Sequence, residues 1–386
     1  MVYLKKGGSQ MNRTLVIVIF GLVLSSFAMA CTPKATPSST SAPPAAATSK
    51  PTSQATISQD VNWAKVVEAA KKEGRVTLYT FFFTAQAQQI GKVFNKAYPE
   101  IELEFVPMAT AVRLERLKTE QRLGQYIADT SDGSTSAQLN LKKEGILMPI
   151  GDLPSLTDRA WSRSPQLDPE SYLISLLLNY NSFAINTGLM KTGEEPKSLK
   201  DILDPKWRGK IIATEPATSV HTSVMYAGYT RYGKADDAYF RQLGPQLKFV
   251  TGSVLDSARA LARGESPLGW NSSSTINPLI KDGAPIKPIV LQEGAISSYS
   301  SVLTIVKNAP HPNASRVFYN WLLSKEGQTA VMENQGQKSM RSDVPDMSPP
   351  AARIDWQTPI ALNLEDLDYG EQVFSSRKLV DMWGRK

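Results

Sequence analysis

The segment 75–106, RVTLYTFFFTAQAQQIGKVFNKAYPEIELEFV, decides the fold class. Its first part, up to Phe83, is a short apolar block rich in aromatic residues. From Ile90 onward, apolar residues recur at i, i+3, i+4 and i+7, the spacing of one helix face. The last part alternates apolar and acidic residues, which is the period of a half-exposed strand. We therefore predict a βαβ unit, and with it a parallel α/β sheet that has a right-handed crossover.

The end of the first predicted strand is the first candidate for a ligand site. In open α/β sheets, ligands bind beyond the carboxyl ends of the strands, where the amino termini of helices point. In this chain that position is occupied by Phe82, Phe83 and Thr84. No glycine-rich phosphate-binding loop follows this strand, so a nucleotide is not expected there.

The amino end has the form of a lipoprotein signal. Arg13 precedes an apolar run at 15–24 that is too short to span a bilayer, and residues 1–30 are predicted to be a signal peptide. Cys31, the sole cysteine, follows Ala-Met-Ala as in a bacterial lipobox, so lipid attachment is predicted there. Residues 31–59 are rich in Pro, Ser, Thr and Ala and are expected to be a disordered tether. The alternative is an incidental thiol beside an ordinary cleavage site.

Size and charge indicate a chain large enough for two lobes and do not favour nucleic-acid binding. The chain has 386 residues, enough for two lobes with their own cores, and a net charge of +7. Residues 1–30 contain three basic and no acidic residues, so the remainder carries +4. These charges are spread along the chain, which does not indicate nucleic-acid binding. We expect a monomer located outside the cytoplasm and anchored to the membrane by lipid.

Hydroxyl-rich loops follow several predicted strands and open predicted helices. A short strand is expected at 127–129, and a basic helix at 110–123 places Arg113 in its first turn near the strand ends. The predicted ligand-binding residues in these loops, besides those after the first strand, are Arg113, Ser134, Thr135, Thr218, Ser219, Trp270, Asn271, Ser272 and Tyr299. Their hydroxyls, aromatic faces and helix amino termini suit a small organic anion. The competing interpretation is that the serines only cap helices and that Phe82 and Trp270 belong to the core.

No catalytic motif is present. The two histidines, His221 and His311, lie far apart, and the spacing gives no HExxH, CxxC or nucleophile elbow. His221 is expected to be a surface residue at the start of a helix. We predict no catalytic residue, no metal ligand and no cofactor, and therefore a protein that is not an enzyme.

Two further stretches carry a family resemblance. They are PKSLKDILDPKWRGK at 196–210 and ASRVFYNWLLSKEGQ at 314–328. Together with the signal peptide, the lipobox-like cysteine and the βαβ start, they resemble the family 1 extracellular solute-binding proteins of ABC importers, in particular the ferric-iron-binding branch. The resemblance implies a two-lobed periplasmic-binding-protein fold of type II, with the ligand between the lobes and an ABC permease as partner.

The resemblance also implies lobe boundaries. The first lobe would comprise 60–175 plus 290–325, and the second lobe 176–289 plus 326–386. The long apolar run at 176–185 and the segment 285–291 are expected to be hinge strands that join the lobes.

This chain departs from the iron-binding branch in the residues expected to bind the ligand. Those proteins typically carry adjacent tyrosines where this chain has Trp270-Asn271-Ser272-Ser273, and often a histidine where it has Phe82 and Phe83. Ferric iron needs hard anionic oxygen ligands, so iron binding is not carried over. The favoured function is capture of a small organic anion for import. The alternatives are binding of ferric iron or an iron complex, a lipid-anchored extracytoplasmic hydrolase, and an adhesion or scaffold lipoprotein.

Overall fold

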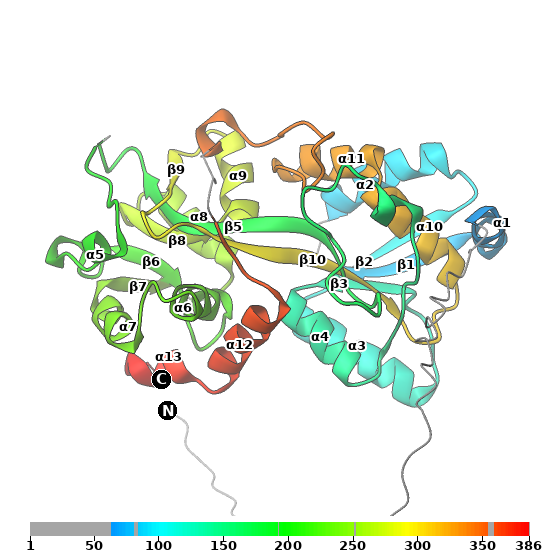
Figure 1. The fold of residues 1–386 in the computed structure, drawn as a ribbon, viewed down its shortest axis with the longest axis horizontal. Helices are drawn as coiled ribbons and strands as arrows, with labels where there is room; N and C mark the ends of the chain where they lie inside the picture. The colour runs from blue at the N-terminus through cyan, green and yellow to red at the C-terminus, as the bar shows by residue number, and fades with distance from the viewer. Residues whose placement is uncertain (1–62, 81–83, 192, 251, 354–358, 386) are drawn as a thin grey trace, which may run out of the picture. The chain divides into compact units, whose positions relative to one another are not determined.

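The computed structural model describes residues 63–80, 84–191, 193–250, 252–353 and 359–385 (Figure 1). The strands are β1 (Arg75–Thr80), β2 (Glu102–Pro107), β3 (Thr130–Gly133), β4 (Leu147–Met148), β5 (Ile174–Asn186), β6 (Ile211–Thr214), β7 (Leu247–Val250), β8 (Leu268–Ser272), β9 (Ile286–Ile289), β10 (Ile296–Val306) and β11 (Ile360–Ala361). The α-helices are α1 (Trp63–Glu73), α2 (Thr84–Ala97), α3 (Thr110–Leu123), α4 (Thr135–Lys143), α5 (Leu199–Ile202), α6 (His221–Arg231), α7 (Asp237–Leu243), α8 (Val254–Ala262), α9 (Ser273–Lys281), α10 (Pro312–Leu323), α11 (Lys325–Gln335), α12 (Leu364–Ser375) and α13 (Lys378–Met382). Short 3-10 helices occur at η1 (Pro154–Thr157), η2 (Pro205–Trp207), η3 (Gly244–Gln246) and η4 (Pro350–Ala352).

The predicted βαβ unit is confirmed. β1 and β2 pair in parallel, with Arg75 opposite Glu102, and α2 connects them. The helix buries Ile90 and Phe94, and the Phe94 ring lies edge-on to Trp321 of α10 at 5.3 Å between centroids. The apolar spacing that predicts the helix is therefore the face that fills the core.

A single hydrogen-bonded order of strands runs through the described residues: β2-β1-β3-β10-β5-β8-β6-β7. β4 and β11 pair with β10, and β9 pairs with β5. The two longest strands, β5 and β10, are antiparallel neighbours at the middle of this order (Figure 1). The sheet therefore has a parallel set on each side of a long antiparallel pair.

The two long strands join two separately packed lobes. Leu176 of β5 and Leu303 of β10 belong to a core formed with α1, α2 and α10. Phe183 of β5 and Ile296 of β10 belong to a different core, formed with α6, β6 and β8. Each long strand thus begins in one core and ends in the other, which confirms the predicted two-lobed fold with hinge strands.

Two details of the lobes differ from the prediction. The second connecting strand is β10, whereas the predicted 285–291 forms the short β9, which pairs with β5 only over Phe183–Asn186 and stays beside the second core. In addition, α11 lies in the segment expected in the second lobe, yet its Val331 and Met332 pack into the first core. Periodicity along the chain identifies an element but not the core on which it packs.

The strand expected at 127–129 lies three residues later, at β3. Ile127 is 47% exposed, while the polar residues Thr130–Gly133 are buried between β1 and β10. The carboxylate of Asp129 instead accepts hydrogen bonds from the backbone N–H groups of Thr77 (2.8 Å) and His311 (2.7 Å). The prediction followed hydrophobicity, but this central strand is held by its hydrogen-bonded neighbours on both sides.

The two stretches that carry the family resemblance have clear structural roles. In 196–210, Ser198 and Asp201 form a capping box, and the indole N–H of Trp207 donates to the Asp201 carbonyl at 2.9 Å. In 314–328, Gly327 packs against the end of α10, where an added Cβ would lie 2.0 Å from the Trp321 carbonyl oxygen. Only glycine fits such a close backbone approach, which explains why this residue belongs to the pattern.

Within the described residues, no helix is both long enough and apolar enough to cross a bilayer.

Candidate functional site

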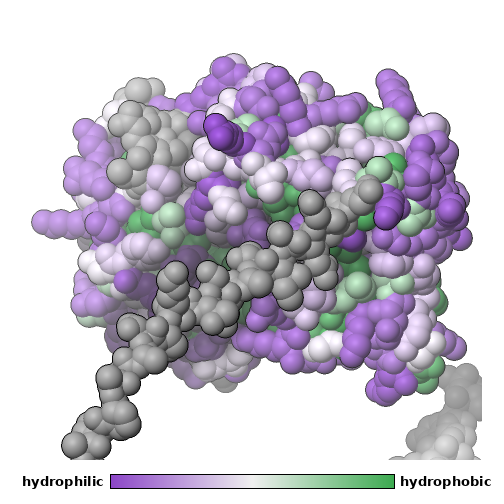
Figure 2. Space-filling model, turned by 45° about the vertical axis from the view of Figure 1, so that its right-hand side comes forward, coloured by the Kyte–Doolittle hydropathy of each residue, from purple (hydrophilic) through white to green (hydrophobic). Residues whose placement is uncertain are grey.

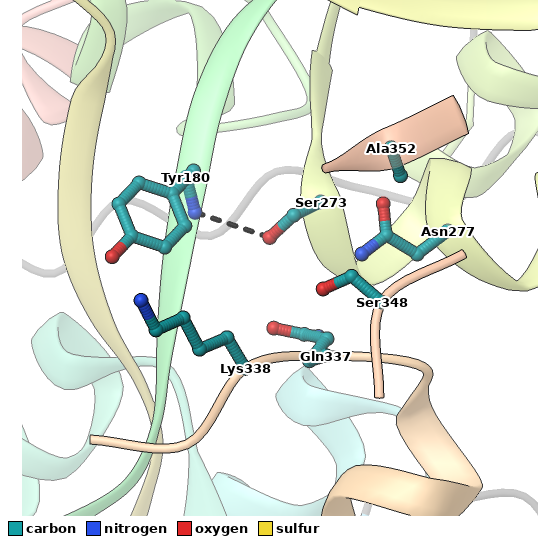
Figure 3. Close-up of a pocket in the computed structure, with 7 residues that line it drawn as sticks. All are labelled: Tyr180, Ser273, Asn277, Gln337, Lys338, Ser348 and Ala352. Atoms are coloured by element: carbon teal, nitrogen blue, oxygen red, sulfur yellow. Dashed lines mark hydrogen bonds between the residues drawn. The ribbon is translucent and has the colours of Figure 1, made fainter. Parts of the chain in front are cut away.

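A polar pocket lies where β5, the start of α9 and the segment after α11 come together (Figure 3). One alanine is the exception among otherwise polar lining residues, which are Tyr180, Ser273, Asn277, Gln337, Lys338, Ser348 and Ala352. No carboxylate belongs to this lining, and one side chain, Lys338, is cationic. The residues come from segments far apart in the sequence, and only the fold assembles them.

The amino terminus of α9 forms one side of the pocket. β8 ends at Ser272 and α9 begins at Ser273, so the strand runs directly into the helix. The Ser273 hydroxyl accepts a hydrogen bond from the Tyr180 backbone N–H at 3.1 Å (Figure 3). The Ser272 side chain does not cap the helix and instead lies 3.1 Å from the Ser274 hydroxyl. The first amides of a helix have no intrahelical partner, so an oxyanion is a suitable partner here.

The opposite side is a connection between the two lobes. Gly336 ends α11 in the left-handed conformation, and its carbonyl accepts a hydrogen bond from Asn277 of α9 at 2.8 Å. The next residue, Gln337, is 2% exposed, and its Nε2 has no hydrogen-bond partner in the structure as described. This buried amide donor is directed neither to backbone nor to another side chain that the structure describes.

An exposed lysine and a half-buried tyrosine complete the chemistry of the pocket. Lys338 is exposed, and none of the ion pairs among the described residues involves it. Burial raises the pKa of the Tyr180 phenol, so the hydroxyl stays protonated at neutral pH. In Figure 3 the Lys338 side chain extends toward the Tyr180 ring. The pocket lining therefore presents a cation, a phenol and a helix terminus, and the nearby Asp346 carboxylate lies outside the lining.

The residues predicted from sequence lie at several places. Phe82 and Phe83 are outside the described residues, and Thr84 is the first residue of α2. Ser272 adjoins the pocket residue Ser273. None of the predicted ligand residues is itself among the pocket lining, and their role in binding stays a prediction.

Two of the predicted loops do meet. Thr135, the first residue of α4, donates its hydroxyl to the backbone carbonyl of Tyr299 at 3.1 Å, while Ser134 caps α4 by accepting from the Ala137 N–H. The Tyr299 hydroxyl is 2.7 Å from Nε of Arg163, whose guanidinium also stacks over the Tyr299 ring at 4.2 Å. Arg163 was not predicted, because nothing in the surrounding sequence places it beside β10.

Trp270 and His221 lie together in the second core, not at a surface. Trp270 is fully buried, with Phe183 edge-on at 5.2 Å and the His221 ring at 5.9 Å. His221 is 7% exposed, and its Nε2 is 3.2 Å from the Asn181 side-chain oxygen of β5. Burial lowers the pKa of His221 to about 4, so the ring is neutral at physiological pH. The expectation of a surface histidine is therefore wrong.

Asn271 and Arg113 are buried with polar atoms unused. Both amide atoms of Asn271 lack a partner within the described residues, and the side chain is fully enclosed. Arg113 is also enclosed; its Nη1 donates to the Met108 carbonyl at 3.3 Å, while Nε and Nη2 have no partner there. Burial lowers the pKa of Arg113, and the nearby Asp132 carboxylate opposes that shift. Unpaired buried polar groups are uncommon and point to a missing partner.

The turn that precedes α6 is fixed by an ion pair. The backbone N–H groups of Thr218 and Ser219 both donate to the Glu215 carbonyl, and the Ser219 hydroxyl accepts from the His221 N–H at 3.3 Å. The Glu215 carboxylate is nearly buried and lies 2.6 Å from Nη2 of Arg385. Thr218 and Ser219 therefore act here as turn residues, in line with the capping interpretation.

Comparison with known proteins shows to which family the chain belongs. The model of the bacterial extracellular solute-binding proteins matches residues 89–359. The chain belongs to this family. Solute-binding proteins of this kind work outside the cytoplasm, take up small ligands and deliver them to ABC importers.

Similar proteins differ in the ligands named for them. A Salmonella typhi protein described as a candidate 2-aminoethylphosphonate-binding periplasmic protein is 30% identical over 187 residues, which are 46% of this chain and 54% of that protein. The periplasmic binding protein AfuA of Actinobacillus pleuropneumoniae, solved with fructose 6-phosphate, is 21% identical with a TM-score of 0.63, and the match covers 81% of this chain and 99% of AfuA. Iron-bound HitA of Pseudomonas aeruginosa is 19% identical with a TM-score of 0.66, covering 79% and 99%. The two solved structures establish the type II periplasmic-binding-protein fold.

In this solute-binding protein, sequence reasoning missed the residues that line the pocket. Ser273 follows directly on the predicted Trp270-Asn271-Ser272 loop, so a longer segment would have included it. Gln337 and Lys338 carry no signal in the sequence, because they lie in an irregular connection after α11 and not after a strand. The described residues contain no group of three or more His, Cys, Asp or Glu side chains placed to hold a metal ion.

Proposed function

We propose that this solute-binding protein captures a small organic oxyanion, of the phosphonate or phosphate-ester class, for uptake by an ABC importer. The observation that carries the proposal is the pocket at α9, which joins a helix amino terminus and an exposed, ion-pair-free Lys338 with no carboxylate in the lining. Oxyanions are bound by such termini and by charge-assisted hydrogen bonds from cations. The ligands named for the Salmonella typhi relative and for AfuA are of this chemical class, which supports the same assignment.

The binding proposal includes the sequence-predicted residues as further ligand contacts. In it, 60–175 plus 290–325 and 176–289 plus 326–386 are the proposed lobes except for α11, which packs with the first lobe, and closure about β5 and β10 brings their loops together. The unpaired polar atoms of Arg113 and Asn271 are the strongest of these candidates, because a ligand oxygen or amine would supply the partners they lack.

Binding is tested with the purified exported protein and a panel of defined solutes. The panel contains 2-aminoethylphosphonate, methylphosphonate, fructose 6-phosphate and ferric citrate, with ethanolamine and fructose as matched solutes that lack the phosphorus oxyanion. A phosphorus oxyanion present at a hundred times its Kd should raise the free energy of unfolding by about 2.7 kcal/mol, because it binds only the folded state. Thermal denaturation and titration calorimetry measure the effect.

The panel also separates the alternatives. Stabilisation by ferric citrate without any response to the phosphorus compounds would replace the proposal with iron or iron-complex binding. Release of inorganic phosphate from fructose 6-phosphate during the titration would indicate a hydrolase.

Lipid anchoring at Cys31 is part of the proposal. Cys31 lies outside the described residues, and the support is the order of basic, apolar and small residues before it and the tether after it. Mass spectrometry of the mature amino terminus should show an acylated cysteine, and a Cys31→Ala variant should move from the membrane fraction to the soluble fraction. An unmodified Cys31, or cleavage at another position, would contradict this assignment.

A further inference from the structure

We propose that Gln337 and Lys338, in the connection that follows α11, bind the anionic group of the solute together with the amino terminus of α9. This inference rests on the proposed function and assigns the selectivity for an oxyanion to a segment outside the loops at the strand ends. A single anionic group of the ligand would accept hydrogen bonds from one charged side chain, one buried side-chain amide and the first backbone amides of a helix.

The charge comes from Lys338. It is the cationic side chain of the pocket lining and forms no ion pair with a described residue, while the Asp346 carboxylate lies close enough to add to the effect of burial in raising the pKa of Tyr180. A lysine ammonium without an ion pair in a concave polar site attracts anions more strongly than on an open surface, since the surrounding protein lowers the local dielectric constant. Tyr180, whose phenol stays protonated, lines the same pocket.

The buried donor comes from Gln337. Its Nε2 is enclosed and has no described partner, and leaving such a buried donor unpaired is unfavourable. A ligand oxygen in the pocket would satisfy it. This gives the pocket a second donor independent of the uncapped first turn of α9, a helix of nine residues.

Hydrogen bonds of the residues before and after Gln337 and Lys338 hold this connection in place. Asn277 of α9 binds the Gly336 carbonyl, and the Ser339 hydroxyl donates to the Gln328 side-chain oxygen of α11 at 2.6 Å. Gln337 itself is fixed through its backbone, since its N–H donates to the Met332 carbonyl and its carbonyl accepts from Met347. The backbone that carries both donors is therefore positioned before a ligand arrives, which reduces the entropy lost on binding.

The experiment compares three lysine variants by titration calorimetry with 2-aminoethylphosphonate, and with 3-aminopropanoate as the carboxylate counterpart. Lys338→Gln should raise the Kd for the phosphonate about tenfold or more, since it removes a charge-assisted hydrogen bond to the anionic group. Lys338→Arg should remain within about threefold of the wild type. Lys325→Gln, which removes an exposed charge at the start of α11, the helix that precedes Lys338, should leave the Kd unchanged. Weaker binding of the carboxylate by the wild type would assign the site to phosphorus oxyanions.

A second variant separates binding from folding. Gln337→Met keeps the length of the side chain and removes the unpaired donor, so it should weaken phosphonate binding while the ligand-free protein remains as stable as the wild type or becomes more stable. Wild-type affinity in Lys338→Gln and Gln337→Met would overturn the inference and leave the proposed function intact. Absence of binding to any oxyanion by the wild type would overturn both.

Discussion

Replacement of Trp270 by alanine should lower the free energy of unfolding by about 3–5 kcal/mol, the usual cost of removing a large aromatic side chain from a packed core. Trp270 is fully buried in the second core, between Phe183 of the hinge strand β5 and the His221 ring of α6. Because the surrounding strands are paired on both sides, the backbone has little freedom to close the cavity. Urea unfolding followed by circular dichroism measures the loss.

The matched variant is Trp270→Phe, which retains most of the ring volume and removes an indole N–H that has no described partner. It should cost clearly less stability than alanine. If Trp270→Ala instead unfolds like the wild type but no longer binds the solute, Trp270 is a ligand contact, as the sequence predicts, and its place in the core matters little for folding.

Acid should destabilise the protein through His221 by about 3 kcal/mol between neutral pH and pH 4. Burial lowers the pKa of this histidine to about 4 in the folded protein, while the unfolded chain has a pKa near 6.5. Between these two values the unfolded state binds a proton that the folded state does not, so stability falls as the pH decreases through this window. Above about pH 7 the ring is neutral in both states and contributes no pH dependence.

A His221→Gln variant isolates this contribution. Carboxylates titrate in the same pH range, so the informative quantity is the difference between the wild type and the variant in the free energy of unfolding at each pH. That difference should change steeply between pH 6.5 and pH 4 and remain constant above pH 7. Parallel curves over the whole range would show that the histidine is accessible to protons in the folded state.

Much of the fold could be predicted because its elements carry local signals. The βαβ start and the long strand at β5 each depend on residues close in sequence. The positions of β3 and α11 were harder to predict, and for the same reason. The polar strand β3 forms because β1 and β10 lie on either side of it, and α11 joins the first core through Val331 and Met332. Contacts between distant segments, not periodicity, determine both placements.

The site was less predictable than the fold. Topology correctly suggested that loops from different strands meet, as Thr135 and Tyr299 do. It could not show that Trp270 points into a core, since a single aromatic residue at the end of a strand has the same pattern whichever face of the sheet it occupies. Gln337 and Lys338 lie outside any helix or strand, so no pattern in the sequence marks them.

The irregular connection after α11 has an evolutionary consequence. Gln337 and Lys338 contribute side chains to the pocket but take no part in strand pairing or helix packing, while the anchoring contacts of Gly336 and Ser339 lie on either side of them. Substitutions at these two positions can therefore change which solute is accepted without a large loss of stability. Duplicated copies of such a receptor could diverge toward new nutrients in a few steps, while the rest of the molecule, including the surfaces that meet its transporter, stays the same.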